Sequence, residues 1–236
     1  MTIDNNDLLN SILASLDRVK CINPEDIPSI DLYMDQVTTF MDSQLRSSVR
    51  YPGEDKILTK TMINNYAKND LLPPPVKKKY SKEHVLLLVF IYYYKGILSI
   101  GDIQKLLHPV TERFFQSDGS FNLESVYREA FSMEDAQVEA LKADVIQKFR
   151  VAEGTFQDAP EESREFLQKF AFICALSFDV YLKKLLIEKL VDELAEPVSG
   201  KEKEKEKAKE KGKEKEKVKE KEKEEKEKQK EKEKQI

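Results

Sequence analysis

The chain has 236 residues, of which 36% are charged and 40% hydrophobic, and it contains 7 Gly, 2 Cys and no Trp. Residues 201–236 hold 17 Lys and 13 Glu, a net charge of +4, so residues 1–200 hold 23 basic and 31 acidic residues, a net charge of −8. The longest apolar run covers only ten residues, 85–94, against the ~20 that a membrane-spanning helix needs. Together with two widely separated cysteines, these features predict a reduced cytoplasmic protein without signal peptide, membrane segment, metal or cofactor.

Capping residues and apolar spacing predict helices throughout residues 1–200, and no segment alternates like a strand. The predicted helices cover approximately residues 7–19, 30–46, 59–69, 81–96, 99–107, 132–149 and 163–194. Pro109 follows the helix at 99–107 and is expected to end it. The predicted fold class is therefore all-α, with at most a two-stranded wing.

The helix at 163–194 is apolar on more than one side, so it is expected either to pack inside the monomer or to pair with a second copy. We predict a homodimer through the C-terminal helices, because so much apolar surface is hard to cover within one chain. Cys174 lies among apolar neighbours on this helix and is expected to be a small buried core residue.

The Lys/Glu segment at the end of the chain has a different character. Its near-strict alternation places opposite charges three residues apart and like charges four residues apart, so the helical neighbour terms largely cancel. Since it also lacks an apolar face, residues 199–236 are predicted to form a disordered or marginally helical low-complexity tail.

Positive charge is concentrated between residues 56 and 82, where the only acidic residue is Asp70. This segment has a net charge of +6 within a body of −8. Its lysines are Lys56, Lys60, Lys68, Lys77, Lys78, Lys79 and Lys82. Such a local excess indicates an anionic partner, because affinity for nucleic acid comes largely from neutralising phosphates.

The predicted helix at 59–69 has one polar and one apolar side. Lys60, Asn64 and Lys68 share a face at a spacing of four residues, and Thr61 and Asn65 lie beside them. Asn can bond bidentately to adenine in the major groove, and flanking lysines can hold phosphates. The alternative is an ordinary solvated surface helix. The apolar side carries Met62, Ile63 and Tyr66, which would seat the helix on its neighbours.

Residues 58–73, LTKTMINNYAKNDLLP, resemble the recognition-helix segment of MerR-type regulators, with Ile63, Tyr66 and Leu71-Leu72-Pro73 matching in order. The following 78–80, KKY, resembles the wing, and 95–107, KGILSIGDIQKLL, resembles a helix after the wing. Asn64 stands where MerR proteins have Arg, and the wing is short. Most of residues 1–200, including 31–36, DLYMDQ, and 179–184, DVYLKK, also resemble a bacterial domain-of-unknown-function family described as having a MerR-like helix-turn-helix.

This resemblance implies a winged-helix core with a short or vestigial wing that binds double-stranded DNA as a transcription regulator. The implied domains are an N-terminal helix and linker at 1–29, a DNA-binding domain at 30–108, a C-terminal helical dimerisation or effector region at 109–198, and the tail at 199–236. The candidate DNA-binding residues are Lys60, Thr61, Asn64, Asn65, Tyr66, Lys68, Lys77, Lys78, Lys79 and Tyr80.

The acidic body and the short wing also fit a non-enzymatic helical protein-interaction module, which is the alternative interpretation. An enzyme is not expected. His84 is predicted to be a surface residue in the first turn of its helix, and His108 lies at a helix end. Neither has a nucleophile or carboxylate at suggestive spacing, and there is no glycine-rich phosphate loop.

Overall fold

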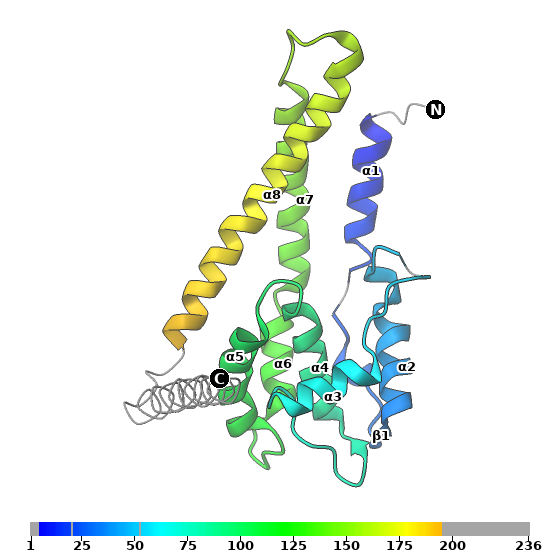
Figure 1. Ribbon diagram of the computed structural model, residues 1–236, viewed down its shortest axis with the longest axis vertical. Helices are drawn as coiled ribbons and strands as arrows, with labels where there is room; N and C mark the ends of the chain where they lie inside the picture. The colour runs from blue at the N-terminus through cyan, green and yellow to red at the C-terminus, as the bar shows by residue number, and fades with distance from the viewer. Residues whose placement is uncertain (1–4, 20, 52, 195–236) are drawn as a thin grey trace, which may run out of the picture. The chain divides into compact units, whose positions relative to one another are not determined.

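A computed structural model of the chain describes residues 5–19, 21–51 and 53–194, which fall in one compact unit, Met1–Leu194. The predicted tail lies outside the described residues. The chain is mostly helical, with a single two-stranded antiparallel sheet among the described residues (Figure 1), so the all-α prediction is confirmed at this level. The elements are α1 (Asn5–Leu16), η1 (Pro24–Asp26), β1 (Leu32–Tyr33), α2 (Met34–Leu45), η2 (Arg46–Ser48), α3 (Lys60–Lys68), β2 (Lys79–Tyr80), α4 (Lys82–Tyr94), α5 (Ile100–Phe114), α6 (Leu123–Phe131), α7 (Glu134–Glu153) and α8 (Glu161–Leu194).

Several helices begin where the sequence predicts. Thr59, Ser81 and Ser99 are the N-cap residues of α3, α4 and α5. The side chains of Thr59 and Ser99 accept hydrogen bonds from backbone N–H groups in the first turn, at 3.2 Å in both helices. These bonds satisfy donors that have no partner within the helix.

The helix prediction was wrong in three places. The helix predicted from residue 30 begins at Met34, because Leu32 and Tyr33 form β1. α5 continues through Pro109 to Phe114, because Leu107, Val110 and Phe114 keep packing against the core and compensate for the hydrogen bond that proline cannot donate. The short helix α6 was not predicted at all. Its N-cap is Asn122, whose side-chain oxygen accepts from the Ser125 N–H at 3.1 Å.

The main core surrounds α4. Every residue from His84 to Ile91 is buried, and the helix contacts α6 and β2. Because α4 is apolar on all sides, it can be stable only when other elements cover it on all sides. Leu123 and Tyr127 of α6 provide part of that cover, and the Tyr127 hydroxyl donates a 2.7 Å hydrogen bond to the carbonyl of Ile22.

A second, smaller cluster joins α7 to α8 and α1. Val145, Phe149 and Ala152 of α7 are buried against Phe172 of α8, with the rings of Phe149 and Phe172 edge to face at 5.3 Å. α1 packs on α7, and α8 also contacts α5 (Figure 1). Among the described residues, no helix is long and apolar enough to cross a membrane.

α8 is unusual because most of its apolar residues are exposed. Only Phe172 and Val191 of its 34 residues are buried. Cys174 is exposed, so the prediction of a buried core cysteine was wrong. The sequence correctly predicts an apolar helix here, but it does not predict that the elements of this chain leave so much of it uncovered.

Candidate nucleic-acid interface

α3 presents a polar face to solvent and an apolar face to the protein. Ile63 and Tyr66 are buried, and burial raises the pKa of Tyr66 above its ordinary value. On the other side, Thr61, Asn64, Asn65 and Lys68 are exposed. Tyr66 therefore holds the helix in place, and its side chain offers little surface to a ligand.

The exposed face of α3 is free of internal bonds except at one end. Lys60 forms an ion pair with Asp35 at the start of α2. Among the described residues, no hydrogen bond or ion pair engages the side chains of Thr61, Asn64, Asn65 or Lys68. Two amides, a hydroxyl and an ammonium are therefore available to a partner, whereas Lys60 would have to share its charge with Asp35.

A tight turn at 76–79 displays two lysines. The Lys79 N–H donates to the Val76 carbonyl at 2.9 Å, and the central residues Lys77 and Lys78 have φ values of 49° and 64°. Positive φ at both central positions defines a type I′ turn, which strongly prefers Asn-Gly. Left-handed geometry costs an L-residue roughly 1–2 kcal/mol. Lysines at these two positions therefore lower stability, and both side chains are exposed.

The sheet anchors this turn to the rest of the unit. β2 pairs antiparallel with β1, in the register Leu32 to Tyr80 and Tyr33 to Lys79. The partner of β2 is therefore a strand that precedes α2, and not a second strand of a separate wing. Lys79 Nζ lies over the Tyr33 ring, 5.2 Å from its centroid. Tyr80 is buried, so it fixes the turn and does not itself face solvent.

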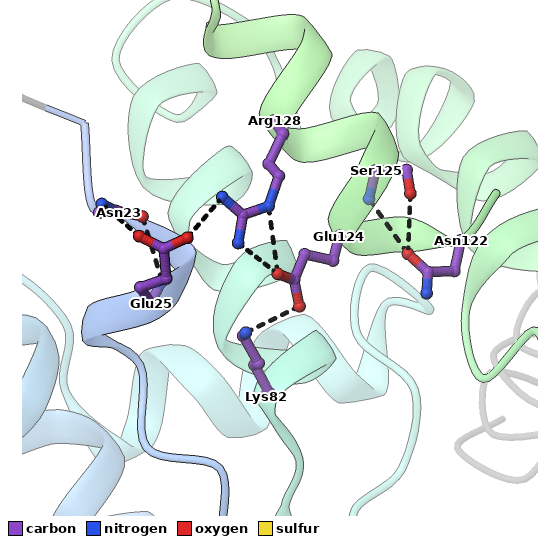
Figure 2. Close-up of polar contacts among 7 residues, drawn as sticks. All are labelled: Asn23, Glu25, Lys82, Asn122, Glu124, Ser125 and Arg128. Carbon is purple, nitrogen blue, oxygen red and sulfur yellow. Dashed lines mark hydrogen bonds and ion pairs between the residues drawn. The ribbon is translucent and has the colours of Figure 1, made fainter. Parts of the chain in front are cut away.

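Lys82, the last lysine of the basic segment, is used internally (Figure 2). Its Nζ lies 2.7 Å from Glu124 of α6, and Glu124 also accepts a 2.6 Å hydrogen bond from Arg128. The hydrogen bonds from Lys82 and Arg128 lower the pKa of Glu124 despite partial burial. Arg128 in turn pairs with Glu25 at 3.2 Å. Lys82 therefore holds α6 against the start of α4.

His84 is buried, so the prediction of a surface histidine was wrong. Its Nδ1 accepts a 3.0 Å hydrogen bond from the Ser81 N–H, which closes a capping box at the start of α4. The ring lies edge to face with Tyr80 at 5.5 Å and with Phe115 at 4.8 Å. Burial lowers the pKa of His84, and the carbonyl of Pro74 opposes this only in part. Burial therefore favours the neutral form of His84, which closes the cap and packs within the core.

The predicted residues thus fall into three groups. Lys60 and Lys79 are partly engaged within the protein, by Asp35 and by the Tyr33 ring. Thr61, Asn64, Asn65, Lys68, Lys77 and Lys78 are exposed on α3 and the turn, and both α3 and β2 pack on α2. Tyr66 and Tyr80 are buried beneath them. Lys56 was left out of the candidate residues but is also exposed next to α3, and its place in the same lysine-rich segment is the signal that could have identified it. In the described part of the chain, no group of His, Cys, Asp or Glu could hold a metal ion.

These features define a mostly helical protein in which two basic elements, α3 and the turn before β2, both adjoin α2. Residues 22–130 match the model of a family described as a domain of unknown function (DUF1836). The match includes α2 to α5 and most of α6, and it supports the predicted resemblance to such a family over that range. α7 and α8, and with them residues 179–184, lie outside it. The searches of curated proteins and of solved structures found no match.

Proposed function

We propose that the chain is a DNA-binding, transcription-regulator-like protein. The observation that carries this proposal is the pair of strained, exposed lysines at positions 77 and 78 beside the uncommitted polar face of α3. Lysines in a turn that prefers Asn-Gly lower the free energy of unfolding and place two positive charges at its tip. Positive charge at such a position would interact favourably with the phosphate oxygens of DNA.

The order of the elements also supports a MerR-like winged helix. β1, α2, α3 and β2 follow one another, the two strands pair antiparallel, and a tight turn lies just before β2. In this proposal α3 is the recognition helix, and the turn at 76–79 is a wing reduced to its tip.

The residues then have distinct roles in binding double-stranded DNA. α3 enters the major groove with Thr61, Asn64 and Asn65 at base edges, where they read sequence. Lys68, Lys77 and Lys78 contact phosphates and fix the register, with Lys60 and Lys79 at the margin. Tyr66 and Tyr80 act through packing alone, because both are buried.

The test begins with a random-library DNA selection on the full chain, followed by binding of the enriched site at several salt concentrations. The informative variant carries Lys77→Asn and Lys78→Gly. It places the preferred residues in the type I′ turn, so it should raise the free energy of unfolding by about 1 kcal/mol. It should also weaken binding to all sequences and make the salt slope shallower by about 2, at ~0.9 per lost phosphate contact.

Because this variant should be more stable than the wild type, a measured increase in its free energy of unfolding would assign any loss of binding to the lost charge, which makes it a sharper probe than alanine substitutions. Asn64→Ala is its counterpart, expected to relax sequence preference while leaving the salt slope unchanged. Asp158→Ala, at an exposed residue between α7 and α8, serves as a control for surface substitution. The proposal fails if the turn variant keeps both the affinity and the salt slope of the wild-type chain.

A second candidate function is a non-enzymatic protein-interaction module with a vestigial wing. The ion pairs Lys60–Asp35 and Lys82–Glu124 favour this function, because they neutralise two of the seven lysines of the basic segment. The net charge of −8 on residues 1–200 favours it as well. Its acidic protein partner would occupy the same lysine turn. Absence of any enriched DNA sequence, or binding that vanishes at physiological salt, would favour this function over the first.

A further inference from the structure

A row of exposed residues runs along α8 at a spacing of four: Phe166, Phe170, Cys174, Phe178 and Leu182. The exposed fractions of its four large members are 69%, 52%, 59% and 42%, and Cys174 is exposed as well. Such a row forms a continuous ridge on a helix surface. Large apolar ridges of this kind are rarely left in contact with water.

The described part of the chain leaves the ridge uncovered. Phe172 is the buried contact to α7, and two residues of helix place it about 200° around the axis from Cys174, on the opposite side. Near the other end of α8, Lys105 of α5 reaches Asp192 at 3.2 Å and Val191 is buried in the main core. α8 is therefore held by α7 around Phe172 and by α5 near its C-terminal end, and the centre of the ridge at Cys174 points away from α7.

The ridge is nearly symmetric about its centre. Phe170 and Phe178 lie four residues on either side of Cys174, and Phe166 and Leu182 lie eight residues on either side. A two-fold axis at Cys174 would place each large side chain of one copy against a large side chain of the other. The small central residue would let the two helices approach closely. A surface that is complementary to itself in this way is what a two-fold dimer requires.

Charge distribution selects the relative direction of the two helices. Glu161 and Glu162 lie at one end of α8, and Lys183 and Lys184 lie beyond the other end of the ridge. Antiparallel helices centred on Cys174 bring Glu161 and Glu162 of each copy within about a turn of Lys183 and Lys184 of the other and set Glu165 opposite Lys183, whereas Arg164 falls opposite Lys184. Parallel helices would place like charges side by side, which is unfavourable.

The exposed area is sufficient for a stable dimer. Ile173, Tyr181 and Leu185 widen the ridge, with exposed fractions of 58%, 57% and 45%. At about 200 Å² for a fully exposed large side chain, the ridge and these residues expose about 750 Å². A standard interface buries roughly 800 Å² on each partner.

We propose that the chain forms a homodimer in which the α8 ridges of two copies pack antiparallel, with the two-fold axis at Cys174. This inference does not depend on DNA binding. It names the surface, the direction and the central residue of the dimer, and each of these can be tested separately.

The first experiment measures the mass of the full chain by sedimentation equilibrium. The wild type should be a dimer, and the double variant Phe170→Glu with Phe178→Glu should be a monomer with an unchanged circular dichroism spectrum, because both side chains are exposed. Ile30→Glu changes an equally exposed residue before β1 and should leave the dimer intact. A wild-type monomer at every concentration, or a dimer that survives the double substitution, overturns the proposal.

Disulfide formation then tests direction, with copper phenanthroline as the oxidant. In the wild type Cys174 should link the two copies. Cys21 is half-buried, and burial together with the charge of Glu134 raises the pKa of its thiol to about 12, which disfavours the thiolate that reacts. On a Cys174→Ala background, chains with Phe166→Cys should link to tagged chains with Leu182→Cys and not to themselves. Self-linking of the Phe166→Cys chains without mixed products would overturn the antiparallel arrangement, and failure of Cys174 to link would overturn the central position.

Discussion

α4 and α8 look alike in sequence but differ in the structure. Both are rich in large apolar residues on more than one side. In α4 every residue from His84 to Ile91 is buried, whereas α8 buries only Phe172 and Val191. α4 is enclosed by its neighbours in one core, whereas α8 contacts α7 and α5 and leaves most of its apolar side chains exposed.

The difference shows that the apolar content of a helix predicts that its surface must be buried, but does not identify the elements that bury it. α4 obtains cover from elements far apart in the chain, such as Leu32 of β1, Ile63 of α3 and Tyr127 of α6. α8 follows the last of these elements, so the described chain has nothing further to place against its outer face. α4 therefore contributes to the stability of the fold, and α8 is available for association with a second copy of the chain.

Leu87→Ala should produce the largest effect that distinguishes the two helices. Leu87 is fully buried in α4, and truncation of such a residue costs about 2–5 kcal/mol through lost burial and the cavity that remains. Phe170→Ala removes a larger side chain from α8, yet it should change the free energy of unfolding of the monomer by less than about 0.5 kcal/mol. Urea denaturation of dilute protein measures both values.

The dilution matters because Phe170 contributes to the proposed dimer. Repeating the Phe170→Ala measurement at high protein concentration should increase its cost, since unfolding then also breaks the dimer. Leu87→Ala should show the same cost at both concentrations. Equal costs for the two substitutions in dilute protein would contradict the contrast between α4 and α8.

Asn122→Ala tests the cover that α6 places over α4. Loss of the side-chain cap that binds the Ser125 N–H should cost about 1 kcal/mol, within the usual range of ~0.5–2 kcal/mol. Because α6 holds Glu124 against Lys82 of α4, fraying of its first turn should also expose amides of α4. Hydrogen exchange should therefore accelerate at the start of α4 and stay unchanged in α8, and equal acceleration in both helices would be inconsistent with this role.

The sequence predicts the helices that have caps and regular apolar spacing, because these signals act within a few residues. Thr59, Ser81 and Ser99 are the clear cases. It does not predict α6, whose nine residues depend on packing over α4. Nor does it predict that α5 passes through Pro109, since the compensating contacts come from residues distant in the chain.

The same limit applies to the candidate interface. Exposure of Asn64 and Lys68 follows from helical spacing, and so does burial of Ile63. The left-handed geometry of Lys77 and Lys78 does not, because their sequence lacks the Asn or Gly that normally indicates such a turn. The ion pair of Lys82 with Glu124 joins residues that are distant in the chain, so no local pattern could reveal it.

His84 gives the smallest and most selective prediction, a dependence of the stability of the α4 core on pH. Burial lowers the folded-state pKa of His84, whereas in the unfolded chain it titrates near 6.5. The unfolded state therefore binds more protons below about pH 6.5, so the contribution of His84 is fully present above that pH and decreases as the pH falls towards the folded pKa. Protonation of Nδ1 would also remove the acceptor for the Ser81 N–H.

His84→Gln isolates this effect, because glutamine at the same position can close the capping box and does not titrate. Urea denaturation between about pH 5 and 7 should show the wild type losing stability on acidification and the variant losing less. Glu83, whose pKa is raised by burial, acts in the opposite direction, but it is common to both proteins and cancels in the difference. Parallel pH profiles for wild type and His84→Gln would show that His84 carries no such dependence, and that the stability of the core around α4 does not change with the protonation of its buried histidine.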